Sequence, residues 1–177
     1  YAVAVFTNPT QDPLDYHGTM GEYLNAKKLL FDNLSGDAVA VTNCDDEWGM
    51  KIVSTSPGRT ISYGVAEKAD VRATDIRISL EGTSVNIRSG NQGSTLISPL
   101  VGRFNVYNIL AAYSTGIALG HSHETIAAGI SSVKNVRGRF ERIVSPQGWT
   151  AIIDYAHTPD ALEKCLRTIH DVLPKEG

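Results

Sequence analysis

The chain has 177 residues, of which 42% are hydrophobic and 20% are charged, and its formal net charge is −3. This balance is ordinary for a folded protein and gives no electrostatic reason to expect nucleic acid as a partner, although loops and helix N-termini could still bind phosphate. The two cysteines are far apart, and no apolar run is long enough to span a membrane. The sequence therefore predicts a reduced, cytoplasmic protein with no membrane partner.

The first part of the chain predicts a strand–helix–strand unit. Residues 1–6 are a continuous apolar run, typical of a buried parallel strand. Thr19 followed by Glu22 is a capping-box pattern, which predicts a helix from about Met20. Residues 37–42 form a second apolar run, so the segment predicts a βαβ unit. Because the chain begins inside a predicted core strand, we expect it to be a piece of a longer protein.

Lys27 lies in the middle of the apolar stripe of this helix. The stripe is formed by Met20, Tyr23, Leu24, Leu30, Phe31 and Leu34. A lysine in this position must extend its ammonium group to water, pair with a buried carboxylate or lose its charge. The neutral amine could add carbon dioxide and become a carbamate, an anionic oxygen donor that suits magnesium. A lysine that reaches water is the simpler interpretation of the position alone.

The stretch 51–100 predicts a small antiparallel sheet attached to the parallel one. Short β-type segments at 52–53, 60–64, 71–80, 84–88 and 95–100 are separated by glycine-containing turns. Apolar and polar residues alternate imperfectly between 71 and 78. We expect this sheet to be mainly structural.

Residues 101–120 predict a helix that Asn105 caps and Gly120 ends. Asn108 lies one turn from Asn105 on the same side, so the two amides could face one ligand, although helix capping explains both residues more simply. A shorter helix follows at 123–133. Its predicted inward-facing residues are Ile126, Ile130 and Val133.

The last part of the chain predicts a linker, a strand and a helix. Residues 135–143 are charged and lack a helical period, so they are the best linker candidate, with Arg139 solvated. A strand at 149–153 precedes Asp154 and His157, where an α/β sheet binds anions and metals. Thr158 caps the following helix, which starts at Pro159. Its apolar face is formed by Ala161, Leu162, Cys165, Leu166, Ile169, Val172 and Leu173.

Several of these motifs resemble the Mur ligase family. They are T-N at 7–8, D-x-L-D-Y-H-G at 12–18, A-K-x-x-L-F at 26–31, N-x-D-D at 43–46, G-x-F-N-x-x-N-x-L-A-A at 102–112, G-R-x-E at 138–141 and D-Y-A-H-T-P-D-A-L at 154–162. The resemblance is closest to the branch that adds the third residue to the peptide of UDP-N-acetylmuramic acid. It implies an α/β fold. Residues 1–136 would be the C-terminal part of a central ATPase domain, with the antiparallel part at 51–100. A hinge at 137–143 would lead to the first strand and helix of a Rossmann-like C-terminal domain at 144–177.

The activity implied by the resemblance is that of an ATP-dependent amide ligase in peptidoglycan synthesis. Such an enzyme phosphorylates the D-glutamate carboxylate of UDP-MurNAc-L-Ala-D-Glu, and the amine of meso-diaminopimelate or L-lysine then attacks the acyl phosphate. The implied cofactors are ATP and magnesium, and the implied partners are the UDP-MurNAc dipeptide and a diamino acid. The protein itself is expected to be a monomer in the cytoplasm. The amino-acid pocket is expected beyond Gly177, and the phosphate-binding loop before Tyr1, so we expect this chain alone to be inactive.

The resemblance also implies site residues. It assigns Lys27, as a carbamate, to catalysis and magnesium binding, and Asp154 and His157 to catalysis at the ATP site. The residues assigned to nucleotide binding are Asn105, Asn108, Arg139, Asp154, Tyr155 and His157. Those assigned to substrate binding are Asn8, Asp15 and His17. The chain departs from the family at Pro13, where a magnesium-binding His is usual. Asp12 and Pro13 still suit a helix start.

Other interpretations remain open at this stage. A different ligase of the superfamily, of the folylpolyglutamate or cyanophycin synthetase type, would share the fold, but the D-Y-H-G and D-Y-A-H-T-P strings favour the first branch. A degenerate, non-catalytic module is suggested by Pro13 and the missing phosphate loop. A metal hydrolase built on Asp15, His17, Asp154 and His157 has no support in their spacing.

Overall fold

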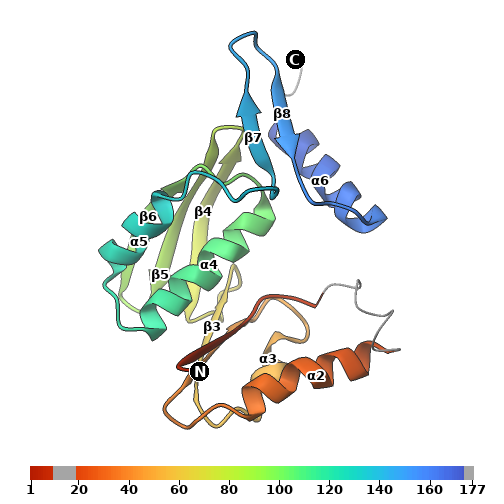
Figure 1. Ribbon diagram of the computed structural model, residues 1–177. Coiled ribbons are helices and arrows are strands. Elements are labelled where there is room, and N and C mark those ends of the chain that lie inside the picture. Colours follow the sequence, from red (N-terminus) through yellow and green to blue (C-terminus); the bar gives the residue numbers. More distant parts are fainter. Residues whose placement is uncertain (10–18, 174–177) are drawn as a thin grey trace.

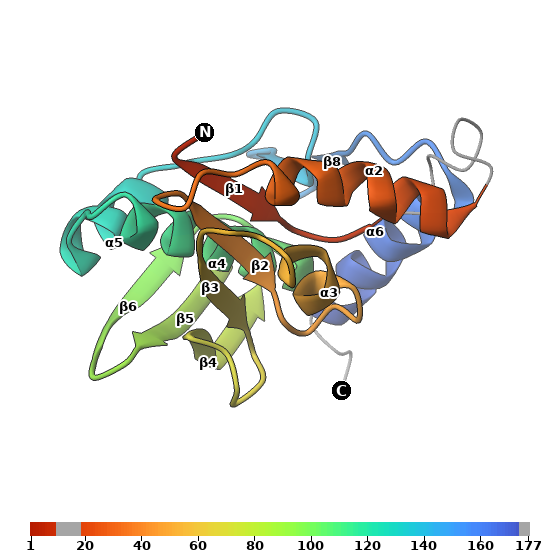
Figure 2. The same cartoon turned by 90° about the horizontal axis from the view of Figure 1, so that it is seen from below.

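The computed structural model describes residues 1–9 and 19–173, and its main element is a six-stranded sheet in the order β1-β2-β3-β4-β5-β6 (Figure 1). The strands are β1 (Val3–Phe6), β2 (Val39–Asn43), β3 (Arg59–Gly64), β4 (Val71–Ser79), β5 (Gly82–Ser89) and β6 (Gln92–Ser98). Strands β1 to β4 pair in parallel, whereas β4 with β5 and β5 with β6 pair antiparallel. The α/β class, with a parallel sheet extended by antiparallel strands, is confirmed. Figure 2 shows the strands fanning out from β1 to β6.

Helices cover both faces of the parallel strands because those strands carry apolar side chains on both sides. They are α2 (Met20–Asp32) and α3 (Gly49–Val53) on one face and α4 (Arg103–Ala118) on the other, and α5 (His123–Ser131) packs against α4 and the antiparallel strand β6. Ala4, Phe6 and Ala40 belong to a buried cluster with α2 and α3. Val39 and Val41 belong to a second cluster with α4 and α5. The alternation along β2 therefore separates two helical layers, which lie on either side of β1 in Figure 1.

Two segments that the sequence assigned to the antiparallel sheet form other elements. Residues 52–53 lie in α3, and Ile52 and Val53 are buried in the cluster shared with α2. Residues 60–64 lie in β3, which pairs in parallel with β2. A short apolar run does not by itself distinguish a buried helical turn from a strand. Antiparallel pairing therefore begins only at β4.

A β-bulge in β4 explains the imperfect alternation of its sequence. The register with β5 shifts around Asp75, whose φ is 50°. Before the bulge Val71 and Ala73 are buried, and after it Ile76 and Ile78 pack against the same core. One extra residue reverses the face to which later side chains point, so a broken pattern still gives one apolar face.

The start of α4 differs from the prediction. Its N-cap is Gly102, with φ 104° and no side-chain cap, so Asn105 is the third residue of the helix and not its cap. The predicted end is confirmed. Gly120 has φ 81° and donates its N–H to Ile117 O at 2.9 Å, as in a Schellman motif.

Two residues predicted to face inward are exposed. Val133 is 40% exposed because α5 ends at Ser131, before that residue. Leu30 is 41% exposed and lies at the edge of the buried stripe of α2. The rest of the predicted α2 stripe is confirmed by the burial of Tyr23, Leu24, Phe31 and Leu34.

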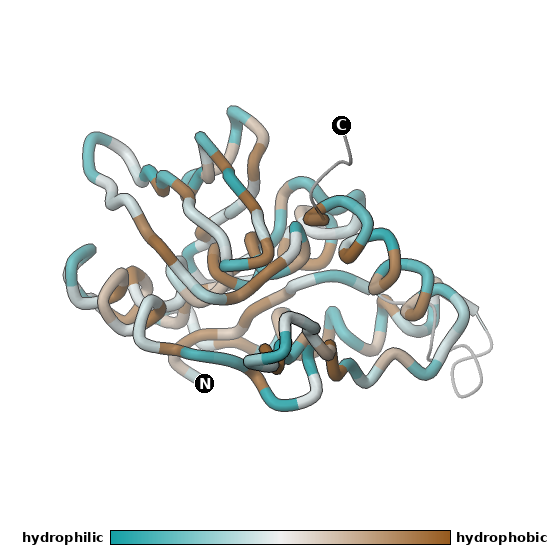
Figure 3. Tube along the Cα trace, turned by 90° about the horizontal axis from the view of Figure 1, so that it is seen from above, coloured by the Kyte–Doolittle hydropathy of each residue, from teal (hydrophilic) through white to brown (hydrophobic). Residues whose placement is uncertain are grey.

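The end of the chain forms a separate two-stranded sheet and a helix. Strands β7 (Glu141–Val144) and β8 (Thr150–Ile153) pair antiparallel, and α6 (Pro159–Val172) follows, with Thr158 as its cap. The predicted linker therefore ends earlier, because β7 begins at Glu141. Hydrophobic positions recur along α6 in Figure 3, yet no residue of α6 is buried within the described part of the chain.

Candidate functional site

Lys27 lies on α2, whose start is fixed by a capping box. Thr19 Oγ1 accepts a hydrogen bond from Glu22 N at 3.2 Å, and the Glu22 carboxylate accepts one from Thr19 N at 3.1 Å. Lys27 is half-buried, and its Nζ lies 4.8 Å from the centroid of the Tyr23 ring. A ring face in this position stabilises the charged ammonium form by about 0.5–1 kcal/mol. Lys27 therefore lies against the apolar stripe, as predicted, with its amino group over the Tyr23 ring.

The other residues assigned to the substrate and the metal are placed only in part. Asn8 follows β1 and is exposed. Asp12, Pro13, Asp15 and His17 lie outside the described residues. Their assignments therefore remain predictions.

The polar turn after β2 forms a compact hydrogen-bonded junction. Asn43 Oδ1 accepts from Asp45 N at 3.0 Å, which is an Asx turn, and Asn43 Nδ2 donates to Thr7 O at 3.2 Å. The Asp45 carboxylate accepts from Val65 N at 2.6 Å and from Ala66 N at 3.2 Å. The ends of β1, β2 and β3 are thus tied together by side chains of one turn.

Tyr107 connects this junction to α4. Its hydroxyl donates a hydrogen bond to Asp45 Oδ2 at 3.1 Å. Burial, and then the neighbouring Asp45 carboxylate, raise the pKa of Tyr107 above its ordinary value. The hydroxyl therefore stays protonated, and remains a donor, at neutral pH.

The two asparagines at the start of α4 touch each other, but they are not equivalent. Asn108 Nδ2 donates to Asn105 Oδ1 at 3.1 Å, and Asn105 Nδ2 donates to Val101 O at 2.8 Å. Asn105 is buried, with both ends of its amide bonded inside the protein, whereas Asn108 is exposed. Asn108 can therefore meet a ligand, and Asn105 orients it.

The turn after β8 is held against the end of the linker. Asp154 Oδ2 accepts a hydrogen bond from Phe140 N at 2.7 Å, and Tyr155 N donates to Gly138 O at 2.8 Å. Gly138 has φ 67° and Phe140 has φ 49°, so the chain bends twice in the left-handed region within three residues. That conformation is uncommon for a bulky residue such as phenylalanine. The Asp154 hydrogen bond stabilises it.

Arg139, Tyr155 and His157 lie together at the surface of this turn. The Arg139 guanidinium carbon is 5.7 Å from the Tyr155 ring centroid, and the Tyr155 and His157 ring centroids are 4.7 Å apart. His157 Nδ1 lies 2.9 Å from Tyr155 O. A carbonyl oxygen only accepts, so Nδ1 carries the proton and a neutral ring has its unprotonated nitrogen at Nε2.

An aromatic contact joins these two groups of residues. Phe104, in the first turn of α4, meets Phe140 edge to face with ring centroids 6.1 Å apart. A Cβ atom built at Gly102 would lie 2.9 Å from Thr168 Cγ2, so the start of α4 also abuts α6. The structure therefore brings Asn108 and the Arg139–His157 group to one region, whereas Lys27 lies in the layer on the other face of the sheet.

Two parts of this arrangement were missed by sequence reasoning. The contact between Phe104 and Phe140 joins residues far apart in the sequence, and neither lies in a periodic pattern that would reveal it. The bond between Tyr107 and Asp45 likewise depends on tertiary structure. The only local sign was that Tyr107 stands between the two asparagines.

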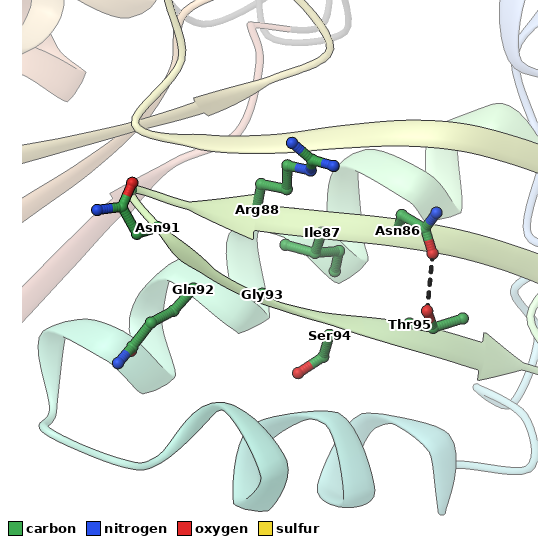
Figure 4. A pocket seen from close by; sticks show the side chains of 9 residues that line it. Asn86, Ile87, Arg88, Asn91, Gln92, Gly93, Ser94 and Thr95 are labelled. Atoms are coloured by element: carbon green, nitrogen blue, oxygen red, sulfur yellow. Dashed lines mark hydrogen bonds between the residues drawn. The ribbon is translucent and has the colours of Figure 1, made fainter.

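A hollow in the described residues lies elsewhere. It has a volume of about 550 Å³ and is lined by both strands of the β5–β6 hairpin, including Arg88, Gln92 and Ser94. Figure 4 shows the bond between Thr95 and Asn86 across the hairpin, which measures 2.8 Å. No predicted site residue lines this hollow, so we assign the site from the residue contacts described above.

The described residues do not form a metal site by themselves. Among residues 1–9 and 19–173, no group of three or more His, Cys, Asp or Glu side chains is placed to hold a metal ion. Lys27 could contribute one oxygen ligand, and only after conversion to a carbamate. No helix in this part of the chain has the length and apolar character needed to cross a membrane.

The fold and the site define an α/β protein whose mainly parallel sheet is followed by a two-stranded sheet and a helix, with polar groups at strand ends and helix starts. Residues 1–116 match the family model of the Mur ligase middle domain, and residues 138–176 match that of the Mur ligase glutamate ligase domain. The chain belongs to the Mur ligase family.

The chain is similar to named ligases of one kind within this family. The chain is 46% identical to the UDP-N-acetylmuramoyl-L-alanyl-D-glutamate–2,6-diaminopimelate ligase of Geobacillus kaustophilus over 97% of its length, and 42% identical to that of Parabacteroides distasonis over 98%. It covers 36% and 35% of those proteins, so it spans about a third of their length. A solved structure of a ligase with the same name matches with a TM-score of 0.83 and 30% identity, covering 98% of this chain and 36% of that one.

Proposed function

We propose that the complete protein carrying this chain is an ATP-dependent ligase that joins 2,6-diaminopimelate to the D-glutamyl carboxylate of UDP-N-acetylmuramoyl-L-alanyl-D-glutamate. The names of the relatives support this substrate pair, and L-lysine is the alternative diamino acid that the sequence left open. The observation that carries the proposal is the turn at 154–157. Its polar groups lie at the end of β8 and the start of α6, against the bent linker and beside α4.

The reaction we propose has two steps. A carboxylate oxygen of the substrate attacks the γ-phosphorus of ATP, which breaks its bond to the β-phosphate and gives an acyl phosphate and ADP. The diamino acid nitrogen then attacks the acyl carbon, which forms the amide, releases phosphate and loses a proton. Catalysis of a phosphoryl transfer consists mainly of positioning the groups and stabilising charge. Magnesium, when bound, would neutralise charge on the transferred phosphoryl group.

In this proposal the residues of the chain have distinct roles. Asn108 contacts the nucleotide, and Asn105 holds the side chain of Asn108 in place. Arg139 provides a fixed positive charge to the phosphates, and Asp154 and His157 are the polar groups of the reacting site. Tyr155 contacts both Arg139 and His157 through its ring and so orients the two side chains.

The roles of Lys27, Asn8, Asp15 and His17 are proposed on the family resemblance alone. Lys27 would become a carbamate by adding carbon dioxide to its neutral amine with loss of a proton, and Asn8, Asp15 and His17 would bind the substrate. We further propose that the protein acts as a monomer in the cytoplasm. Its described cysteines, Cys44 and Cys165, are unpaired, in agreement with a reducing compartment.

The acyl phosphate can be trapped to test the proposal. The complete protein is incubated with magnesium-ATP and the UDP-MurNAc dipeptide, with hydroxylamine in place of the diamino acid. We expect ADP and a hydroxamate of the dipeptide in equal amounts. Release of ADP that does not depend on the dipeptide, or a failure to release any, would contradict the proposed reaction.

A further inference from the structure

We infer that Tyr107 is a positioning residue for nucleotide binding, which acts by fixing the first turns of α4 to the junction at Asp45. The expected effect of Tyr107 on ATP binding rests on the proposed function, whereas its expected effect on the order of α4 does not. The hydroxyl of Tyr107 is the group that makes the connection, through its 3.1 Å hydrogen bond to Asp45 Oδ2.

The start of α4 needs such an anchor because it lacks the usual one. Gly102 at the N-cap has no side chain to accept a hydrogen bond from the first amides of the helix, whereas a Ser, Thr, Asp or Asn cap accepts one of them. Asn105, the third residue, donates its side-chain amide back to Val101 O, outside the helix. The first turn is therefore held by contacts to other elements.

Two such contacts come from residues next to the asparagines in the chain, Phe104 before Asn105 and Tyr107 before Asn108. Phe104 packs on Phe140 of the linker, and Tyr107 bonds to Asp45. The first contact reaches a segment between two matched domains, whereas the second reaches the main sheet. The Tyr107 contact therefore ties Asn108, its neighbour in the chain, to the rigid part of the fold.

Asp45 is a firm attachment point. Its carboxylate also accepts from the backbone amides of Val65 and Ala66, and its own N–H bonds to Asn43. A Cβ atom at Gly64 would lie 2.7 Å from both carboxylate oxygens, so the backbone of β3 closes one side of the carboxylate. A group held by the ends of two strands, β2 and β3, transfers that fixed position to any side chain that bonds to it.

Tyr107→Phe removes only the connecting hydroxyl, and the complete protein offers a matched control. Tyr113→Phe removes another hydroxyl from the same helix, one that bonds to Ser94 at 3.2 Å and lies 2.7 Å from His123 Nδ1, at the opposite end from the site. We expect Tyr107→Phe to raise the KM for ATP by about threefold to tenfold, the range of one lost hydrogen bond, with kcat within about twofold. Tyr113→Phe should leave KM unchanged.

A double variant and hydrogen exchange complete the test. If Tyr107 acts through Asp45, Asp45→Asn combined with Tyr107→Phe should raise KM no more than the stronger single change does. Amides in 103–108 should exchange faster in Tyr107→Phe, without nucleotide, and not in Tyr113→Phe.

The outcomes separate the inference from the proposed function. An active protein whose KM does not change in Tyr107→Phe, or changes equally in Tyr113→Phe, overturns the inference and leaves the function standing. A parent protein without ATP turnover overturns the function. In that case the exchange measurement decides: unchanged protection of 103–108 in Tyr107→Phe overturns the positioning role, and a selective loss supports it.

Discussion

Asp154 serves both the fold and the proposed chemistry, and two substitutions can separate these roles. Its Oδ2 accepts the backbone N–H of Phe140 at 2.7 Å. Asp154→Ala removes this acceptor and the charge together. Asp154→Asn removes the charge but keeps a carbonyl oxygen that can accept the same hydrogen bond.

The magnitudes follow from the partners of Asp154. A hydrogen bond to a charged group contributes about 1.5–3 kcal/mol, and Phe140 N would lose its partner in a residue that already has φ 49° and a buried side chain. We therefore expect Asp154→Ala to lower the free energy of unfolding by about 1–3 kcal/mol. We expect Asp154→Asn to lower it by about 1 kcal/mol or less, because the bond remains in weaker form.

Turnover should respond differently from stability. Both variants lack the carboxylate, so we expect each to reduce kcat of the complete enzyme at least about tenfold, which is 1.4 kcal/mol of transition-state stabilisation. Urea unfolding and steady-state ADP release measure the two quantities. If Asp154→Asn keeps the parent kcat while Asp154→Ala loses stability, Asp154 only anchors the linker and its proposed catalytic role is refuted.

Three further predictions concern other parts of the chain. Gly49→Ala should destabilise the fold by about 3 kcal/mol or more, because its Cβ would lie 1.7 Å from Asn43 O. Gly129→Ala in α5 is the control: its Cβ meets nothing within 4 Å, and it should stabilise the fold by about 0.5–1 kcal/mol. Equal effects of the two variants in thermal unfolding would show that the packing at Gly49 is wrongly described. Cys44 is 5% exposed and Cys165 is half-buried, and burial raises the pKa of both thiols, so alkylation of the native protein should modify the more accessible Cys165 first, with Cys165→Ser as the control. Rapid labelling of Cys44 before unfolding would contradict this. Lys27 should be unmodified in the isolated chain and should gain the mass of one carbon dioxide, lost on acidification, only in the complete enzyme. A carbamate in the isolated chain would show that local contacts suffice to hold it. Tyr23→Leu, which removes the ring beneath the ammonium, should then increase the carbamylated fraction.

Much of the fold followed from the sequence because local patterns and tertiary structure agree. Thr19 and Glu22 form the capping box that starts α2, and Thr158 and Pro159 start α6 as their residue types indicate. The strand predicted at 37–42 is β2, shifted to Val39–Asn43, and every residue of β2 is buried. These signals act within one or two turns of the chain, so the sequence alone reveals them.

The failures occur where a residue outside the recognised pattern, near or distant in the sequence, decides the structure. Asn105 looked like a cap, but the left-handed Gly102 starts the helix earlier and turns the Asn105 amide toward Val101. The apolar pair 52–53 looked like a strand, but a helical turn buries it against α2.

The sequence named the candidate site residues, whose roles remain predictions, but not the contacts between them. Asp154, His157 and Arg139 stood out as polar residues at a strand end and in a linker, and the structure places them together. The resemblance to the Mur ligases treated Asn105 and Asn108 alike, whereas the structure buries one and exposes the other. Which of two amides meets solvent depends on packing, which no spacing rule specifies.

The formation of the amide bond itself tests the central claim most directly. The complete protein is incubated with magnesium-ATP, the UDP-MurNAc dipeptide and either 2,6-diaminopimelate or L-lysine, and the products are separated and weighed by mass spectrometry. The proposed function predicts one amide product per ADP released, formed with 2,6-diaminopimelate in preference to L-lysine and abolished when ATP is left out. ATP consumption that proceeds without joining any diamino acid to the dipeptide would contradict it.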